Sequence, residues 1–376
     1  MFGRKIKILR LSGFDVYVDA SWLVLAALVT WSLADSVFPM MRPGLPKATY
    51  WYMGVGGAIG LFLSIVLHEF AHSVIARANG IRMRGITLFI FGGVAEMMDE
   101  PPTPESEFKM AIAGPIMSVL VAGVCYGGAV VLSGPMEVVS VTLRYLGQIN
   151  LLLAGFNMVP AFPLDGGRVL RSILWKVQNS LKKATHVSSI IGSSFGLFMI
   201  LVGVVSILTG HFVAGFWWFL LGMFVRSAAQ QSYEQVLLRQ YLQGEPVARF
   251  MNRNIVTVPP DLRLDEFVQN YVYYHHFKAY PVVSEGRLLG IVSVEALRGI
   301  PKEQWTTLTV ADAMEPCDGT NSIPPTLDTL QALSLMARQG KSRLLVVENG
   351  ELLGMISFRD IMEFFNLKVA LDESIP

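Results

Sequence analysis

The sequence predicts an α-helical polytopic membrane domain of about six transmembrane helices with a small membrane-level β-sheet, followed by a cytosolic pair of α/β repeats. Three observations support this prediction. Hydrophobic residues make up 52% of the 376 residues and charged residues only 16%, which is too apolar for an ordinary soluble chain. Long apolar runs fill residues 1–230. Two similar segments then follow each other after residue 249.

Six apolar runs predict the transmembrane helices. A helix needs about 20 apolar residues to cross a bilayer. The runs that meet this length are 17–36, 52–77, 109–133, 138–158, 187–209 and 212–229. The opening is basic but lacks a cleavage site of small residues, so we expect the first run to be a retained helix.

The basic residues predict the orientation, because short loops rich in Lys and Arg stay in the cytoplasm. They gather before the first run, after the second and after the fourth: Arg4, Lys5, Lys7, Arg10, Arg77, Arg82, Arg84, Arg168, Arg171, Lys176, Lys182 and Lys183. We therefore expect a multi-pass protein of the cell membrane with both termini and the repeats in the cytoplasm. Cys125 and Cys317 suggest no disulfide, and no nucleic-acid partner is expected.

The second run contains the segment IVLHEFAHSVIA, which places three ionisable groups inside a span. Residues four apart share a helix face, so His68 and His72 can present two nitrogens to one metal ion with Glu69 alongside. A catalytic zinc takes three protein ligands and a water, whose proton Glu69 would accept. The alternative is that neighbours simply satisfy these groups. Ionisable groups in a span cost roughly 2.5 to 3.5 kcal/mol each, which favours the metal site.

The segment FNMVPAFPLDGGRVLR, residues 156–171, offers a third ligand. Pro160 and Pro163 interrupt the fourth span, where freed backbone can line a cavity. The two glycines that follow Asp165 predict a sharp turn immediately after it. The second and fourth spans run in the same direction, so His72 and Asp165 should both lie near the inner side. An ordinary loop aspartate at the membrane boundary is the alternative.

These motifs together resemble the site-2 protease family of intramembrane zinc metalloproteases. The resemblance covers about residues 10–230 and rests on HEFAH (68–72), FGGVA (91–95), AGP (113–115) and NMVPAFPLDGG (157–167).

The resemblance implies a role for each residue of the site. His68, His72 and Asp165 would be the ligands of one Zn²⁺ per chain, and Glu69 would be the catalytic base. Asn157 would stabilise the oxyanion or hold the substrate backbone.

Two segments suggest strands at membrane level. Residues 80–97 are too short and too rich in glycine for a span, but their β-branched and aromatic residues favour strands. Residues 15–21 alternate apolar and polar side chains and can add a strand to the same sheet. An exposed edge of this sheet could hold an unwound substrate by β-addition, and a buried structural hairpin is the alternative.

The last third of the chain contains an internal repeat, in which VVSEGRLLGIVS (282–293) matches VVENGELLGMIS (346–357). Each copy predicts a strand, a tight turn at Gly286 or Gly350, a strand and a helix. An amphipathic helix should precede each copy, near 263–275 and 327–339. The repeats resemble tandem cystathionine-beta-synthase (CBS) domains.

The CBS resemblance implies an adenine nucleotide as a ligand. Its pattern Gly-x-x-Ser/Thr-x-x-Asp is complete in GMISFRD, where Ser357 precedes Asp360, whereas Ala296 takes the place of the aspartate in the first repeat. Asp360 would accept hydrogen bonds from ribose hydroxyls, so one cleft is expected to bind nucleotide. The alternative is a pair that serves only to pack or to form a homodimer.

These observations lead to one prediction of organisation and function. The expected parts are a transmembrane zinc metalloprotease domain (1–230), a connector (231–248), two CBS repeats (249–300 and 308–366) and a tail (367–376). The predicted reaction is hydrolysis of a peptide bond within or next to a transmembrane segment of a substrate protein, in regulated intramembrane proteolysis. A nucleotide-gated transporter and a catalytically inactive membrane scaffold are the alternatives.

Overall fold

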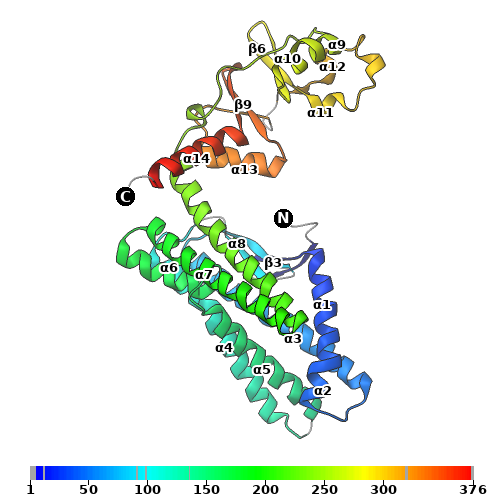
Figure 1. Cartoon of the computed structure of the whole chain (residues 1–376), viewed down its shortest axis with the longest axis vertical. Helices are drawn as coiled ribbons and strands as arrows, with labels where there is room; N and C mark the ends of the chain where they lie inside the picture. The colour runs from blue at the N-terminus through cyan, green and yellow to red at the C-terminus, as the bar shows by residue number, and fades with distance from the viewer. Residues whose placement is uncertain are drawn as a thin grey trace. The chain divides into compact units, whose positions relative to one another are not determined.

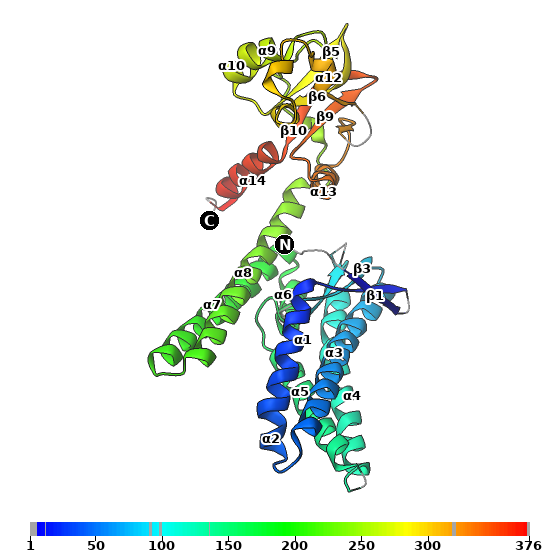
Figure 2. The same cartoon turned by 90° about the vertical axis from the view of Figure 1, so that its right-hand side faces the viewer.

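The computed structural model describes residues 6–11, 13–89, 92–97, 100–134, 136–317 and 321–373. The chain forms two compact units, Met1–Glu234 and Gln235–Pro376. The first unit is a helical domain with a small sheet, and the second contains two small α/β repeats (Figures 1 and 2).

Six helices among the described residues are long and apolar enough to cross a membrane, which confirms the six predicted spans. The first span combines α1 (Ala20–Ser32), a π-helical segment (Leu33–Val37) and α2 (Phe38–Met41). The others are α3 (Lys47–Ala78), α4 (Pro104–Val131), α5 (Glu137–Asn157), α7 (Leu181–Leu208) and α8 (Phe212–Leu242). In the most apolar 18-residue stretch of each span, only 17–39% is buried inside the protein. Most of the apolar surface of the spans is therefore available to lipid.

A four-stranded sheet lies beyond the ends of α1 and α3 (Figure 2). Its strands are β1 (Ile6–Leu11), β2 (Phe14–Val18), β3 (Met83–Phe89) and β4 (Gly92–Met97), in that order. β2 and β3 pair in parallel, whereas the two outer pairs are antiparallel. The strands predicted in 80–97 and 15–21 are therefore confirmed and share one sheet. Phe91 of the FGGVA motif lies outside the described residues.

The break after the fourth span differs from the prediction. α5 ends at Asn157, before the two prolines, as expected, but Asp165 is the first residue of a further helix, α6 (Asp165–Gln178). The predicted sharp turn after Asp165 is therefore wrong, because the chain turns before it. A Cβ on Gly166 would overlap the carbonyl group of Met158, so this glycine lets the first turn of α6 pack directly on the preceding loop.

α7 and α8 are joined by a short turn and pack against each other through small residues. The Ser189 hydroxyl on α7 donates a hydrogen bond of 2.6 Å to the Ala229 carbonyl on α8. α8 continues as one helix to Leu242, so the first part of the predicted connector is helical. Leu237 and Leu242 near its end are buried, and Leu242 belongs to a core of the second unit.

The second unit repeats one strand hairpin. One three-stranded sheet has the order β5-β6-β7 and the other the order β10-β9-β8. The strands are β5 (Ala279–Ser284), β6 (Arg287–Ser293), β7 (Glu315–Pro316), β8 (Ser322–Ile323), β9 (Arg343–Glu348) and β10 (Glu351–Ser357). The hairpins turn at Glu285–Gly286 and Asn349–Gly350, where all four residues have positive φ. This is the conformation of a type I′ turn, so the predicted tight turns are confirmed.

Short helices flank each hairpin. They are α9 (Leu264–Phe267), a π-helical segment (Val268–Val272), α10 (Tyr273–His275), α11 (Val294–Leu297), α12 (Val310–Ala313), α13 (Thr329–Gln339) and α14 (Phe358–Glu373). Single 3₁₀ turns occur at Val247–Arg249 and Lys302–Gln304. The helices predicted near 263–275 and 327–339 are therefore present. Each repeat has its own core, and Val247 and Phe250 pack into the core of the second repeat although they precede the first.

Candidate metal centre

Helix α3 places His68 and His72 on one buried face. The helix is continuous from Lys47 to Ala78, so the two histidines stand one turn apart. Their side chains are only 4% and 9% exposed, in a segment that is otherwise mostly apolar. Their Nε2 atoms lie 3.1 Å apart and therefore point to a common position.

Asp165 completes this group from the first turn of α6. Its Oδ2 atom lies 3.1 Å from His68 Nε2 and 3.2 Å from His72 Nε2. The three side chains can offer ligand atoms that all lie within 4.8 Å of one another, the only such group of three or more His, Cys, Asp or Glu among the described residues. The structure thus brings together the three residues that the sequence predicted as ligands.

Two groups on helix α4 contact the Nδ1 atoms of the two histidines. His72 Nδ1 lies 2.7 Å from the Met110 carbonyl oxygen, which can only accept, so Nδ1 carries the proton and Nε2 keeps its lone pair for a metal. His68 Nδ1 lies 2.9 Å from the Ser118 hydroxyl and can donate to it in the same way. Such hydrogen bonds fix the tautomer and the orientation of metal-binding histidines.

Gly114 lets α4 pass directly beside the two histidines. A Cβ on Gly114 would overlap the Nε2 atoms of both His68 and His72. Any larger residue at this position would therefore occupy the place where the ligand atoms meet. This close packing explains the glycine of the AGP motif, and the sequence alone did not show it.

Glu69 lies between the histidines in sequence and faces strand β4. A Cβ on Gly93 would be 2.8 Å from Glu69 Cγ and 3.0 Å from Ile65 Cγ2, so the β4 backbone runs close to this side chain. Glu69 is half-buried. Glu69 directly follows His68 in the chain.

The donor set fits zinc. Zinc binds imidazole nitrogen and carboxylate oxygen at about 2.0 to 2.2 Å, which places ligand atoms about 3.3 Å apart in a tetrahedral site. The observed separations of 3.1 to 3.2 Å are close to that value. Three protein ligands leave the fourth position for water or substrate, the arrangement of a catalytic zinc site.

A buried ion pair joins α6 to α4. Arg171 Nε donates a hydrogen bond of 2.6 Å to Glu107, and the Arg171 and Glu107 side chains are only 4% and 0% exposed. Arg171 also bonds Glu100 at 3.3 Å, and its guanidinium lies 5.1 Å from the centre of the Phe162 ring. Arg171 is one of the basic residues from which the orientation was predicted, and the structure shows that Glu107 compensates its charge inside the protein.

The substitution Arg171→Met should destabilise the fold strongly. It would leave the Glu107 carboxylate buried without its cation, which costs about 3 to 5 kcal/mol. Thermal unfolding of the purified protein in detergent measures the effect, and adding Glu107→Leu should restore much of the stability. Lys176→Met is the matched control, because Lys176 also links α6 to α4, through Glu105, but in an exposed pair. Equal melting temperatures for Arg171→Met and the parent would contradict this role.

The other predicted site residues are Asn157, Ser357 and Asp360, and none of them belongs to the group of His68, His72 and Asp165. Asn157 is the last residue of α5, and its side-chain amide makes no hydrogen bond to any described residue. In the second unit, Asp360 accepts hydrogen bonds from the Ser357 N–H at 2.9 Å and the Ser357 hydroxyl at 2.7 Å. These two residues therefore form a cap at the start of α14.

Comparisons with known proteins agree with this architecture. The sequence matches the model of peptidase family M50 over residues 56–142 and 135–203, and the CBS domain model over 247–302 and 318–366. It is 33% identical over 363 residues to Rip3 of Mycobacterium tuberculosis, covering 95% of this chain and 92% of Rip3. It is also 35% identical over 308 residues to zinc metalloprotease MJ0392 of Methanocaldococcus jannaschii. This match covers 82% of this chain and 84% of MJ0392.

Solved structures are also similar to this chain. The site-2 protease from Methanocaldococcus jannaschii is matched with 29% sequence identity and a TM-score of 0.42, over 61% of this chain and 95% of that chain.

The membrane-spanning helix α3 and the neighbouring helix α6 thus bring two histidines and a carboxylate together at one candidate metal site. The chain belongs to peptidase family M50, the site-2 proteases, and carries a C-terminal pair of CBS domains. The zinc metalloprotease relatives support zinc as its metal.

Proposed function

We propose that this protein is an intramembrane protease that hydrolyses a peptide bond within or next to a transmembrane segment of a substrate protein, in regulated intramembrane proteolysis. The convergence of His68, His72 and Asp165 on one buried point carries the proposal. Membership of family M50 supports it.

The residues of the site have complementary roles in this reaction. A bound zinc would supply an electrophile for the scissile carbonyl and make water a stronger acid. The Glu69 carboxylate accepts the proton of the attacking water and returns it to the leaving amine nitrogen. The Asn157 amide donates a hydrogen bond to the oxyanion or to the substrate backbone. An Asn157→Ala protein that cleaves as fast as the parent would exclude the last role.

Strand β4 is suited to present the substrate. It is an edge strand of the four-stranded sheet, and its backbone at Gly93 runs beside Glu69. An unwound substrate segment added to this edge would gain backbone hydrogen bonds and pass close to the catalytic base. Pro substitutions in the substrate segment that pairs with β4 should therefore slow cleavage, and unchanged rates would argue against β-addition.

The position of the cut tests the proposed function and topology together. With the basic loops and both termini in the cytoplasm, the end of α3 that carries His72 lies toward the cytoplasmic side. Purified protein incubated with a single-span substrate should cut in the cytoplasmic half of that span, and a chelator should stop the reaction. Mass spectrometry of the products locates the cut. Cuts near the outer face would refute the topology, and cleavage that survives the chelator would refute the metalloprotease.

The CBS pair is proposed to bind an adenine nucleotide through Ser357 and Asp360 and thereby modulate proteolysis. Asp360→Ala should abolish AMP binding to the full-length protein, as measured by calorimetry, because the ribose hydroxyls lose their acceptor. Asp312→Ala is the matched control. Asp312 likewise accepts hydrogen bonds from the N–H and hydroxyl of Thr309 at the start of a helix, but it lies outside the ribose motif. Unchanged AMP affinity in Asp360→Ala would exclude this site.

A further inference from the structure

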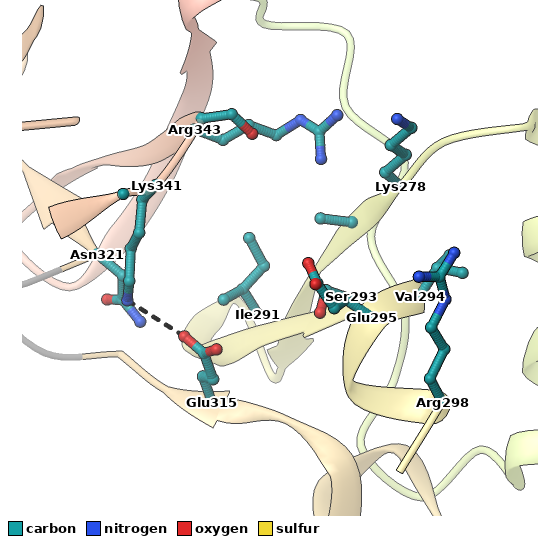
Figure 3. Close-up of a pocket in the computed structure, with 13 residues that line it drawn as sticks. Lys278, Ile291, Ser293, Val294, Glu295, Arg298, Glu315, Asn321, Lys341 and Arg343 are labelled. Atoms are coloured by element: carbon teal, nitrogen blue, oxygen red, sulfur yellow. Dashed lines mark hydrogen bonds and ion pairs between the residues drawn. The ribbon is translucent and has the colours of Figure 1, made fainter. Parts of the chain in front are cut away.

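A groove of about 490 Å³ runs between helices α3 and α4 of the membrane domain. Nine of the eleven residues that line it are apolar, and the other two are Asn79 and Lys109. The cavity between the two CBS repeats has a different lining, which includes the cations Lys278, Arg298 and Arg343 (Figure 3). Apolar walls with a few polar groups are typical of a site in which the polar groups fix the orientation of a largely apolar ligand.

Asn79 and Lys109 lie at the same end of the groove. Asn79 directly follows the last residue of α3. Met110, which is next to Lys109 in the chain, packs with Ala76 in the last turn of α3. This is the end of α3 that the basic loops predict to face the cytoplasm.

The length of the groove matches one leaflet of a bilayer. The groove follows α4 from Lys109 to Leu120, and these eleven steps along a helix span about 16 Å. The hydrocarbon core of a bilayer is about 30 Å thick, so one leaflet accounts for about half of it. A transmembrane helix of a partner would need an apolar surface of the full thickness, whereas the acyl chain of a lipid occupies a single leaflet.

The polar end of the groove can bind an anion. Among the described residues, no carboxylate forms an ion pair with Lys109, because Glu105, one turn earlier on α4, is paired with Lys176 at 2.9 Å. The Asn79 side chain donates one N–H to the Ile75 carbonyl at 2.7 Å. A side-chain amide has a second N–H, which can donate to a ligand. A cation and an amide donor between transmembrane helices on the cytoplasmic side suit the phosphate of a lipid head group.

We propose that this groove binds one anionic phospholipid of the inner leaflet. Lys109 and Asn79 bind its phosphate, and one acyl chain lies along the groove. Lys109 and Met117 are next in sequence to Met110 and Ser118, which contact the two metal-site histidines. A lipid that contacts both helices therefore stabilises the packing that orients these histidines. The choice of leaflet rests on the proposed topology, and any influence on proteolysis rests on the proposed function.

Native mass spectrometry of the full-length protein in detergent, with phosphatidylglycerol or phosphatidylcholine added at equal concentration, tests the proposal. The parent should retain one phosphatidylglycerol per chain and bind phosphatidylcholine far more weakly. Lys109→Gln should weaken phosphatidylglycerol binding about tenfold, the effect of losing a charge-assisted hydrogen bond. Lys183→Gln is the control, because Lys183 is an exposed cation in the first turn of α7, outside the groove.

A second pair of variants tests the apolar part of the groove. Ile116 and Val119 both lie on α4 and are 49% and 50% exposed, but of the two only Ile116 lines the groove. Ile116→Trp should occupy the space of the acyl chain and sharply reduce phosphatidylglycerol binding. Val119→Trp adds the same side chain beside the groove and should bind phosphatidylglycerol like the parent.

Each measurement has an outcome that overturns the proposal. Equal retention of the two lipids by the parent contradicts it, and so does parent-like binding of phosphatidylglycerol by Lys109→Gln or by Ile116→Trp. Phosphatidylglycerol should also raise the unfolding temperature of the parent more than that of Lys109→Gln, because a ligand that binds only the folded state stabilises it. An equal shift in both proteins would count against the site. Chelator-sensitive proteolysis would leave the protease proposal standing in each of these cases.

Discussion

A Glu69→Gln protein will keep its zinc and lose peptide cleavage. Glutamine preserves the size of the side chain and leaves the three ligands in place, but it cannot accept the proton of the attacking water. General-base catalysis contributes about 10²- to 10⁴-fold to a rate, so cleavage of a single-span substrate should fall by at least about two orders of magnitude. Product formation measured over time, alongside metal analysis of the same sample, gives both results.

Glu105→Gln is the control for this substitution. Glu105 is an exposed carboxylate at the start of α4 that pairs with Lys176, so its loss should leave cleavage close to the parent rate. Rapid proteolysis by a zinc-loaded Glu69→Gln protein would mean that another group accepts the proton.

A Gly114→Ala protein should lose its metal and, with it, its proteolytic activity. The added methyl group would lie at the Nε2 atoms of His68 and His72, so either the rings or helix α4 must move. Changes in residues that only orient the ligands weaken metal binding by about 10- to 100-fold, and this substitution disturbs the ligand atoms themselves. A zinc affinity at least about 100-fold weaker is therefore expected, measured by competition with a chelator.

Gly123→Ala controls for the change of glycine to alanine in the same helix. A Cβ on Gly123 would meet nothing within 4 Å, so zinc binding and cleavage should stay at parent levels. Equal zinc affinity in Gly114→Ala and Gly123→Ala would show that α4 does not pack against the histidines as described.

Much of the fold and of the candidate metal site could be predicted because their signals are local. The spans follow from apolar runs, and the turns at Gly286 and Gly350 follow from glycines between strand-forming residues. His68 and His72 share a helix face through their spacing alone. Asp165 was found because two prolines end α5 before it, and a carboxylate near membrane depth is costly without a function.

The supporting contacts could not be predicted, because they join residues distant in sequence. Met110 and Ser118 are ordinary helix residues, and their role depends on how α4 packs against α3. Arg171 has the sequence signature of a cytoplasmic anchor, and only the distant Glu107 explains its burial. The glycines after Asp165 were assigned to a turn because a sequence does not show which backbone they approach.

The zinc content of purified full-length variants tests the central claim most directly. The parent and Glu69→Gln should each contain about one zinc per chain, whereas Asp165→Ala should contain almost none while its unfolding temperature stays close to that of the parent. This result would show that ligands from α3 and α6 form a single site. A folded Asp165→Ala protein that retains one zinc per chain would contradict the account.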